Sequence, residues 1–410
     1  MKEREEDTGI YVHVPFCISK CPYCDFNSIT VSPIPEGDYI KALDKEIDCY
    51  TKPLTVPFRG NPEKGGLKES VFLEKVKRRV ASIYFGGGTP SLFSVDSIAR
   101  VTDKIMSVFS SNSNVEITLE VNPKTAGIEK LNALYTIGVN RLSLGVQSFQ
   151  DRFLQKLGRI HTSADAVNLF EDARSSGFSN IGLDLIFGTP DQTLADWERD
   201  LNCALSLKPE HISVYNLTIE EDTPFYDLQR KGKITLPDEG IQIRMYRLAQ
   251  EKAAAAGYEQ YEISNFALPG FRCLHNEGYW TLREYFGFGA GAHSYLRETS
   301  DKKDWGIRWK NIPNPYEYIS LLSNNGTAVI EREELTREAA IKEAIFLGLR
   351  RLDGISLDDF EERFDIPLEK TFASIISYLL KENLISIDEG HLKLTIQGIL
   401  LSNEVFLKFF

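Results

Sequence analysis

The chain has 410 residues, of which 42% are apolar and 26% are charged, a composition typical of a globular protein with ample core. Its 47 basic and 59 acidic residues give a net charge of −12, which argues against nucleic-acid binding because such binding needs a basic surface. The sequence has no run of about 20 apolar residues and begins with an acidic stretch, so we expect neither a membrane span nor a signal peptide.

The first two-thirds of the chain alternates short apolar runs with helical patterns. Strands are predicted at 9–14, 81–85, 115–121, 141–146, 180–186 and 211–215, and helices at 38–50, 95–110, 124–137, 163–176 and 193–207. Strands that alternate with helices indicate βαβ units and a parallel sheet. Six units in series favour an α/β fold with a partial (βα)6 barrel of the TIM type, and a doubly wound open sheet is the alternative.

Two stretches interrupt this rhythm. Residues 51–80 contain several prolines and glycines and are predicted to form a surface insertion, and the Pro-rich residues 311–315 are predicted to form a linker. Three helices are predicted after the linker, at 335–350, 356–363 and 368–382, followed by a strand pair at 385–387 and 392–394. Three helices followed by a β-wing predict a C-terminal helical, winged-helix-like domain.

Three cysteines lie close together near the start of the chain, in a Cys-x3-Cys-x2-Cys pattern: Cys17, Cys21 and Cys24. Thiolates hold iron–sulfur clusters, and three of them on a 4Fe-4S cluster would leave one iron open to a small molecule. A zinc ion completed by a distant ligand, or unrelated buried thiols, are the alternatives. The grouping indicates a metal site in a reducing compartment rather than a disulfide framework, so we expect a cytoplasmic protein.

Glycines and polar residues lie at or near the ends of several predicted strands. Gly86-Gly87-Gly88-Thr89-Pro90 follows the second strand, and the next three carry Glu120, Gln147 and Asp184. Binding and catalytic groups in a parallel barrel come from the carboxyl ends of several strands, so these residues predict one common site. Arg159 could bind a carboxylate.

These motifs occur in the order that one family shows. The motifs are Cys-x3-Cys-x2-Cys, Gly-Gly-Gly-Thr-Pro, Glu-x-Asn-Pro, Gly-Val-Gln-Ser and Asp-Leu-Ile-x-Gly-x-Pro. In these motifs the chain resembles radical S-adenosylmethionine (SAM) proteins of the oxygen-independent coproporphyrinogen III oxidase group. The resemblance covers nearly the whole chain. It implies a core barrel at 1–220, an extension of that core at 221–310 and a C-terminal domain at 311–410.

The resemblance also implies cofactors and the residues that hold them. Cys17, Cys21 and Cys24 would bind a 4Fe-4S cluster whose open iron chelates SAM, and one electron from the cluster would cleave the C–S bond of SAM. Two sets of residues match the SAM-contacting positions of the family. The first set, for the SAM at the cluster, is Tyr11, Tyr23, Gly87 and Glu120, and the second, for a further SAM in the oxidase, is Gly88, Thr89, Gln147, Arg159 and Asp184.

Two unlike functions occur within this group. One is the oxidase, which decarboxylates coproporphyrinogen III, and the other is the heme chaperone of the HemW subfamily, which hands heme to target proteins. The oxidase has a further cysteine two residues after the third, where this chain has Phe26, and a long N-terminal segment, where only ten residues precede Tyr11. Both differences argue against coproporphyrinogen dehydrogenase activity, so whether the chain is an enzyme stays open.

Residues 275–280 read His-Asn-Glu-Gly-Tyr-Trp, which resembles the HNxxYW heme-binding motif of the HemW subfamily. A neutral imidazole is a good axial ligand for heme iron, and nearby aromatic rings can pack on the macrocycle. We therefore expect His275 to bind heme, with Cys273 as a weaker second candidate. The resemblance predicts a heme chaperone that serves target proteins such as membrane-bound respiratory enzymes, with a homodimer as an open question. The oxidase and a zinc-stabilised binding module are the alternatives.

Overall fold

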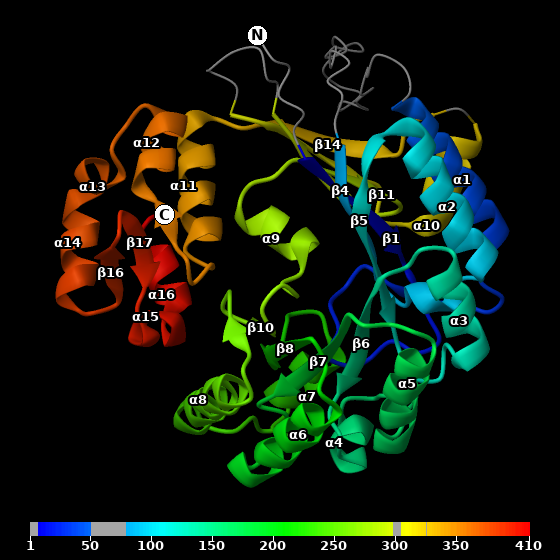
Figure 1. The fold of residues 1–410 in the computed structure, drawn as a ribbon, viewed down its shortest axis with the longest axis horizontal. Helices are drawn as coiled ribbons and strands as arrows, with labels where there is room; N and C mark the ends of the chain where they lie inside the picture. Colours follow the sequence, from blue (N-terminus) through cyan, green and yellow to red (C-terminus); the bar gives the residue numbers. More distant parts are fainter. Residues whose placement is uncertain (1–6, 51–78, 298–304, 325) are drawn as a thin grey trace.

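The computed structural model of the protein describes residues 7–50, 79–297, 305–324 and 326–410. Its main feature is a curved mixed sheet with the strand order β14-β13-β12-β11-β1-β4-β5-β6-β7-β8-β10-β9 (Figure 1). The first half of the chain provides β1 (Asp7–Val14), β4 (Arg79–Gly87), β5 (Ser110–Val121), β6 (Arg141–Gln147), β7 (Ile181–Phe187) and β8 (His211–Asn216). Later segments provide β9 (Glu259–Gln260), β10 (Asn265–Ala267), β11 (Tyr285–Phe288), β12 (His293–Leu296), β13 (Ile307–Asn311) and β14 (Val329–Glu334).

The six strands β1 and β4 to β8 run parallel to one another, and helices connect them on the outer side of the sheet (Figure 1). These helices are α1 (Glu36–Cys49), α2 (Val95–Val108), α3 (Ile128–Thr136), α4 (Asp151–Lys156), α5 (Ser163–Ser175) and α6 (Leu194–Leu207), with a 3-10 helix at Pro90–Leu92. The partial (βα)6 barrel is confirmed. The end strands β14 and β9 do not pair with each other in the part of the chain that the structure describes, so the sheet is open.

Each parallel strand presents apolar side chains to the helices and smaller or polar ones to the interior. In β1, Ile10, Val12 and Val14 belong to the main core, whereas Gly9 and Tyr11 lie close to His275 in the interior. The other parallel strands repeat this alternation, because successive side chains of a strand point to opposite faces. The helices therefore pack on a continuous apolar surface, and the polar residues line the hollow of the barrel.

Local signals explain where several helices begin. Thr162 and Asp165 form a capping box at the start of α5, and Thr193 and Asp196 form another at the start of α6. The helix predicted from residue 124 begins instead at α3, because Lys124 has a left-handed φ of 73° and cannot start a right-handed helix. The helix predicted at 95–110 ends at Val108, since residue 110 already belongs to β5.

The sheet continues well beyond the six predicted strands. After α7 (Pro224–Arg230) and α8 (Glu239–Ala255), β11 returns to lie parallel to β1, and β12, β13 and β14 extend that edge in antiparallel pairs. The stretch 311–315, predicted as a linker, is instead the end of β13 and the start of α10 (Pro315–Ser323), which packs on α1. The boundary predicted at 311 stays a prediction.

One short helix lies on the inner side of the sheet. This helix, α9 (Leu274–Trp280), contacts β1, β4 and the C-terminal helix α11, and lies between the sheet and the C-terminal module (Figure 1). It carries the residues of the predicted heme motif.

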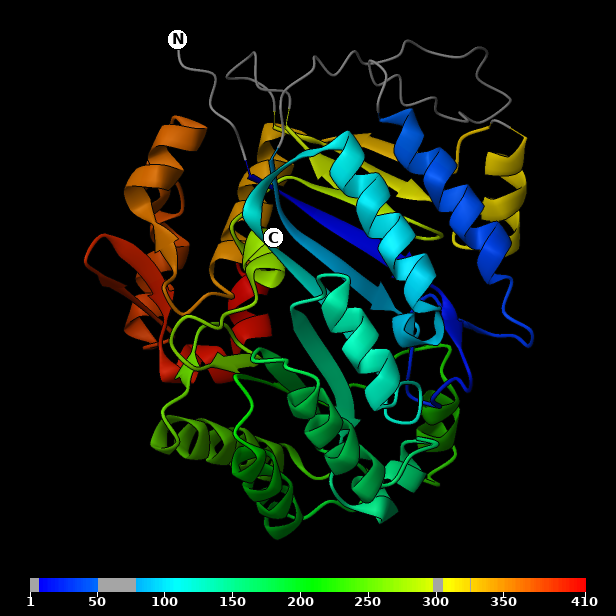
Figure 2. The same ribbon diagram turned by 45° about the vertical axis from the view of Figure 1, so that its right-hand side comes forward.

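The C-terminal module lies beside the open side of the sheet (Figure 2). It comprises α11 (Arg337–Gly348), β15 (Ile355–Ser356), α12 (Leu357–Phe364), α13 (Leu368–Thr371), α14 (Ala373–Lys381), β16 (Ile385–Asp388), β17 (His391–Leu394), α15 (Ile396–Leu400) and α16 (Ser402–Leu407). The order β15-β17-β16 of its small sheet, packed with helices, confirms the winged-helix-like prediction. Within the described ranges, no helix combines the length and apolar character that crossing a membrane requires. The predicted insertion falls mostly outside those ranges, except that residues 79 and 80 belong to β4.

Candidate functional site

The cysteine loop and the carboxyl ends of the parallel strands enclose a cavity of about 350 Å³, a size typical of small-molecule sites. Most residues that the sequence predicted for the site line this cavity, whereas Tyr11, Gly86, Pro90, Cys273 and His275 do not. The lining members are Cys17, Cys21, Tyr23, Cys24, Gly87, Gly88, Thr89, Glu120, Gln147, Arg159 and Asp184. Residues from six separate segments are therefore brought together, while their assignment to particular cofactors stays a prediction.

Cys17 ends β2 (Phe16–Cys17), and Cys21 and Cys24 lie on the loop that connects it to β3 (Ile29–Thr30). Lys20 shapes this loop by donating hydrogen bonds to two of its backbone carbonyls, at 3.1 and 3.2 Å. Burial and the neighbouring thiols raise the pKa of Cys24. None of the six cysteines forms a disulfide.

The arrangement bears on the choice between zinc and a cluster. A zinc ion needs its ligands to converge on one point at about 2.0–2.3 Å, whereas the thiolates of a cluster each bind a different iron. Within residues 7–50, 79–297, 305–324 and 326–410, no three His, Cys, Asp or Glu side chains converge in this way. Three thiols on one loop without a convergent fourth ligand fit a cluster better than a single ion.

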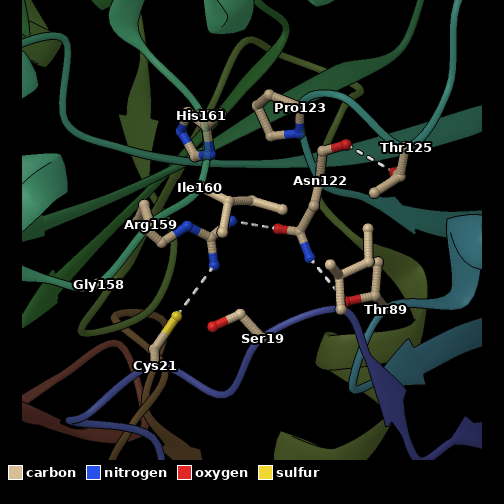
Figure 3. Close-up of a pocket in the computed structure, with 11 residues that line it drawn as sticks. Ser19, Cys21, Thr89, Asn122, Pro123, Thr125, Gly158, Arg159, Ile160 and His161 are labelled. Carbon is tan, nitrogen blue, oxygen red and sulfur yellow. Dashed lines mark hydrogen bonds between the residues drawn. The ribbon is translucent and has the colours of Figure 1, made fainter. Parts of the chain in front are cut away.

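A network of hydrogen bonds connects the cysteine loop to two strand ends (Figure 3). Thr89 donates to the sulfur of Cys17 over 3.6 Å, and the amide of Asn122 donates to the hydroxyl of Thr89 over 3.0 Å. Arg159 lies between Asn122 and Cys21 and donates to both. Asn122 was missed as a site residue, although it is the Asn of the Glu-x-Asn-Pro motif.

Glu120 is the buried carboxylate of the site. Its two oxygens accept hydrogen bonds from the hydroxyl of Tyr84 over 2.9 Å and from the backbone N–H of Gly87 over 3.1 Å. Burial, and then the nearby carboxylate of Asp184, raise the pKa of Glu120 to about 7. Gly87 can present its N–H here because its φ of 111° suits glycine, and a Cβ would lie 2.5 Å from the ring of His13.

Asp184 and Gln147 also line the cavity. The hydroxyl of Ser143 donates to Asp184 over 2.9 Å, and burial raises the pKa of this carboxyl. Gln147 has a left-handed φ of 67°, at an irregularity in the pairing of β6 with β7. Such a backbone costs about 1–3 kcal/mol and clusters at functional sites, so this conformation supports a binding role for Gln147.

The floor of the cavity contains polar residues that the sequence reasoning missed. Arg141 is 1% exposed, and its Nε has no hydrogen-bond partner among the described residues. His211 is also buried and bonds through Nε2 to the hydroxyl of Tyr261 over 2.8 Å. Both lie at the starts of their strands, so a search confined to strand ends could not find them. Their signal is the alternation of polar residues along each strand.

Tyr11 lies beside the cavity but does not line it. Its hydroxyl is 3.0 Å from Nδ1 of His13, whose Nε2 is 2.8 Å from the carbonyl oxygen of Asn27 in the cysteine loop. Its ring stacks against Tyr84 and His275 at 6.2 Å. Tyr11 thus connects the loop to the interior of the barrel, and its predicted contact with SAM stays a prediction.

His275 is 3% exposed and lies beneath the cavity. Its Nδ1 is 3.0 Å from the hydroxyl of Ser82, and its Nε2 is 2.9 Å from the hydroxyl of Tyr279. Burial lowers the pKa of His275 to about 3, so its imidazole is neutral at physiological pH. Asn276, the next residue of the motif, lines the cavity.

Cys273, the second heme-ligand candidate, lies just before α9. It is fully buried, and its thiol is 3.7 Å from a carboxylate oxygen of Glu116. Burial raises the pKa of this thiol to about 12, so it stays protonated at neutral pH. A protonated thiol is a poor metal ligand, which makes His275 the stronger candidate.

Comparison with known proteins agrees with this geometry. Residues 11–204 match the Radical SAM superfamily, and residues 335–401 match the HemN C-terminal domain. The heme chaperone HemW of Bacillus subtilis is 40% identical over 397 residues, covering 97% of both chains. The heme chaperone HemW of Lactococcus lactis is 34% identical and covers 99% of this chain and 98% of its own.

A solved structure also matches the whole chain. Coproporphyrinogen III oxidase (HemN) from Escherichia coli, a radical SAM enzyme, has a TM-score of 0.79 and 25% identity, covering 100% of this chain and 91% of its own. The fold, the cysteine loop and these matches define a protein of the radical SAM superfamily. Within it the chain belongs to the HemW family, since its similarity to the Bacillus subtilis member extends over nearly the full length of both.

Proposed function

We propose that the protein is a cytoplasmic heme chaperone that carries a SAM-accessible 4Fe-4S cluster. Its similarity to proteins named heme chaperone HemW, over 97–99% of the chain, is the observation that carries this proposal. The three-cysteine loop supports it because such a loop suits a cluster in a reducing compartment. The recipients would be heme-dependent proteins, including membrane-bound respiratory enzymes, and a homodimer is open to test.

The cysteine loop and its surroundings would hold the cluster and SAM. Cys17, Cys21 and Cys24 would ligate three irons, and when bound the cluster supplies the electron that cleaves the C–S bond of SAM. The fit rests on three thiols at one cavity, of which Cys17 accepts a hydrogen bond from Thr89 and Cys21 accepts one from Arg159. These bonds would keep the thiols oriented.

The strand ends would bind SAM around the open iron. Glu120 offers carboxylate oxygens, already oriented by two donors, to the positive charge of SAM. Gln147 and Asp184 offer further hydrogen-bonding groups on the cavity wall, in line with their match to the second SAM positions. Tyr23 lines the same cavity beside the cysteines, where burial keeps its hydroxyl protonated.

The competing function is the oxidase reaction on coproporphyrinogen III. The TM-score of 0.79 with the Escherichia coli oxidase favours it, and Phe26 argues against it. Phe26 lines the cavity and is 61% exposed, so an apolar ring stands where the oxidase has a thiol. The family likeness to the chaperones makes heme transport the better-supported function.

One anaerobic experiment separates the two functions. The reconstituted protein is incubated with reductant, SAM and coproporphyrinogen III, and in parallel is loaded with hemin and mixed with an apo-hemoprotein. We expect hemin transfer and no protoporphyrinogen at catalytic rates. Catalytic protoporphyrinogen formation would overturn the chaperone proposal.

Single-residue variants test the assigned ligands. Cys17→Ala, Cys21→Ala and Cys24→Ala should each lose the reconstituted iron, whereas Cys203→Ala, on α6 away from the cavity, should keep it. His275→Ala should lose tight hemin binding. Zinc instead of iron in the purified wild type would contradict the cluster assignment.

A further inference from the structure

The floor of the cavity contains a buried cation that meets no hydrogen-bond acceptor. Arg141, at the start of β6, is 1% exposed and lines the cavity. Among the described residues, its Nε has no partner, and its guanidinium forms neither a hydrogen bond nor a salt bridge with any of them. A buried charge without such partners is costly. A guanidinium of this kind that faces a cavity therefore indicates that a bound group supplies the acceptors.

His211, at the start of β8, provides a second donor without an acceptor. Its Nε2 is 2.8 Å from the hydroxyl of Tyr261, and its buried Nδ1 has no partner in the part of the chain that the structure describes. The buried hydroxyl of Tyr261 accepts the N–H of Cys273 and has no other described acceptor for its own proton, so it donates to Nε2. Burial, and then the charge of Arg141, lower the pKa of His211 and keep it neutral. A neutral imidazole that accepts at Nε2 carries its proton on Nδ1.

Gly182 keeps the space between these two donors open. It pairs with His211 in the register of β7 and β8, and it shares the inner face of β7 with Asp184, which lines the cavity. A Cβ on Gly182 would lie 3.3 Å from Nδ1 of His211 and 3.4 Å from a terminal nitrogen of Arg141. Both donors therefore face the same gap.

The charges around this gap limit what it can bind. Three carboxylates face Arg141, namely Glu116, Glu120 and Asp184. Glu116 already accepts two backbone N–H groups at the start of α9, and burial raises the pKa of Glu120 and of Asp184, which favours their protonated forms. A dianion such as phosphate would be repelled by these groups, whereas one further negative charge can be balanced by Arg141. A planar guanidinium beside one N–H donor suits a carboxylate.

We propose that Arg141 and the Nδ1–H of His211 form a carboxylate-binding subsite at the floor of the cavity, in the gap that Gly182 leaves. The carboxylate belongs to a ligand that occupies the cavity, either the amino-acid end of a SAM molecule or a propionate of heme. The subsite goes beyond the proposed function, because it does not depend on which of these two ligands it serves. Arg141 is then retained for binding and not for the stability of the fold.

Arg141→Met separates a ligand subsite from a structural ion pair. In the reconstituted protein without SAM or hemin, its midpoint of denaturant unfolding should equal or exceed that of wild type, because an unpaired buried charge does not stabilise the fold. In separate anaerobic titrations, its affinity for SAM or for hemin should fall about ten- to hundredfold, the loss expected for a hydrogen bond to a charged group. Arg244→Met, at an exposed position of α8, is the control and should leave both affinities unchanged.

Gly182→Ala tests the gap without changing any charge. The added methyl group would lie between the two donors, so the same ligand should bind about tenfold more weakly, while the iron content stays that of wild type. Gly127→Ala is the matched control, because a Cβ there would meet nothing within 4 Å. This control should bind SAM and hemin as wild type does.

The ligand that is weakened identifies the source of the carboxylate. Weaker binding of SAM alone indicates its amino-acid end, and weaker binding of hemin alone indicates a propionate. If neither affinity falls in Arg141→Met or in Gly182→Ala, the subsite is wrong. A lower unfolding midpoint in Arg141→Met together with wild-type affinities in Gly182→Ala would also overturn it, since Arg141 would then only balance the charge of Glu116. Hemin transfer by the wild-type protein tests the proposed function separately, so the two can fail independently.

Discussion

The guanidinium of Arg159 donates a 3.6 Å hydrogen bond to the sulfur of Cys21, although 138 positions separate the two residues in the chain. It also donates to the carbonyl oxygen of Gly145, over 3.0 Å, and to the side-chain oxygen of Asn122. Both of these acceptors are neutral. The positive charge of Arg159 therefore acts on the sulfur and on whatever the sulfur binds, and it also favours the ionised form of the nearby Asp184 carboxyl.

This contact predicts an effect on the reduction potential of the reconstituted cluster. A nearby cation favours the added electron, so Arg159→Gln should lower the potential by roughly 60 mV, equivalent to about 1.4 kcal/mol for a one-electron couple. Spectroelectrochemical titration measures the shift. Arg152→Gln is the control, because Arg152 lies on α4 and pairs with Asp196 instead. Equal potentials in Arg159→Gln and wild type would contradict the electrostatic role.

Glu120 predicts a pH dependence of SAM binding. Its pKa of about 7 means that the carboxylate gains a proton as the pH falls through neutrality, and the attraction for a cationic ligand is then lost. SAM affinity of the reconstituted protein should therefore decrease from about pH 8 to about pH 6. Isothermal titration calorimetry under anaerobic conditions measures it.

The matched variants sharpen this test. Glu120→Gln should bind SAM about tenfold more weakly at about pH 8 and lose most of the pH dependence, since a hydrogen bond to a charged group is worth about 1.5–3 kcal/mol. Glu129→Gln, at an exposed position of α3, should retain the wild-type profile. A flat wild-type profile would rule out Glu120 as the titrating contact.

The fold was predictable where the sequence pattern is local. Each of the six parallel strands carries its own apolar alternation, and each outer helix has its own periodicity, so neighbouring residues suffice to identify them. The pairing of β11 with β1 could not be predicted, because it joins residues about 275 positions apart and β11 has only four residues. The stretch at 311–315 was wrongly predicted to be a linker because of its prolines. Pro315 instead lies in the first turn of α10, a position where proline is common.

The residues of the site were predictable where they belong to a recognisable sequence motif. The cysteine loop and the polar strand ends were predicted because short stretches of consecutive residues identify their binding groups. Arg141 and His211 were missed because each lies at the start of its strand, away from the strand ends that the motifs mark, and only the sheet brings them to the same cavity. The engagement of both ring nitrogens of His275 depends on Ser82, 193 positions away, which no motif around His275 could reveal.

Gly289, in the turn between β11 and β12, predicts a specific steric effect. Its φ is 104°, and a Cβ would lie 2.6 Å from the carbonyl oxygen of His13 and 2.7 Å from the hydroxyl of Tyr39. Gly289→Ala should destabilise the protein by more than about 3 kcal/mol and reduce cluster retention, because His13 must move. Thermal unfolding and iron content measure the two effects.

Gly270 separates this clash from the backbone strain alone. It also has a positive φ, 86°, but a Cβ there would meet nothing within 4 Å. Gly270→Ala should therefore cost only about 1–2 kcal/mol and leave iron content unchanged. Equal losses in the two variants would show that backbone strain, and not the contact with His13, causes the effect.

Glu46 predicts a pH dependence of stability. This carboxylate of α1 is buried and accepts hydrogen bonds from the N–H of Gly289 over 2.9 Å and from Asn311 and Tyr318 over 2.5 Å. It thereby joins α1 to β13, α10 and the β11–β12 turn. Burial raises its pKa from 4.5 to about 7, so the folded state favours the protonated form.

The sign of the stability change follows from this raised pKa. The contribution of Glu46 to the free energy of unfolding is highest below about pH 4.5, where the group is protonated in both states, and declines as the pH rises. The decline ends above about pH 7, where the group is ionised in both states. Other buried acids, such as Glu120, add similar declines, so the difference between wild type and a variant isolates Glu46.

Two variants complete this test by denaturant unfolding at a series of pH values. Glu46→Gln cannot ionise, so its stability relative to wild type should improve between about pH 4.5 and about pH 7. Glu46→Ala leaves three donors without their acceptor and should lose about 2–4 kcal/mol even where the wild-type carboxyl is protonated. Glu317→Gln, at an exposed position of α10, is the control and should follow wild type. A constant difference between Glu46→Gln and wild type across this range would mean that Glu46 keeps one charge state there, contrary to the effect expected from its burial.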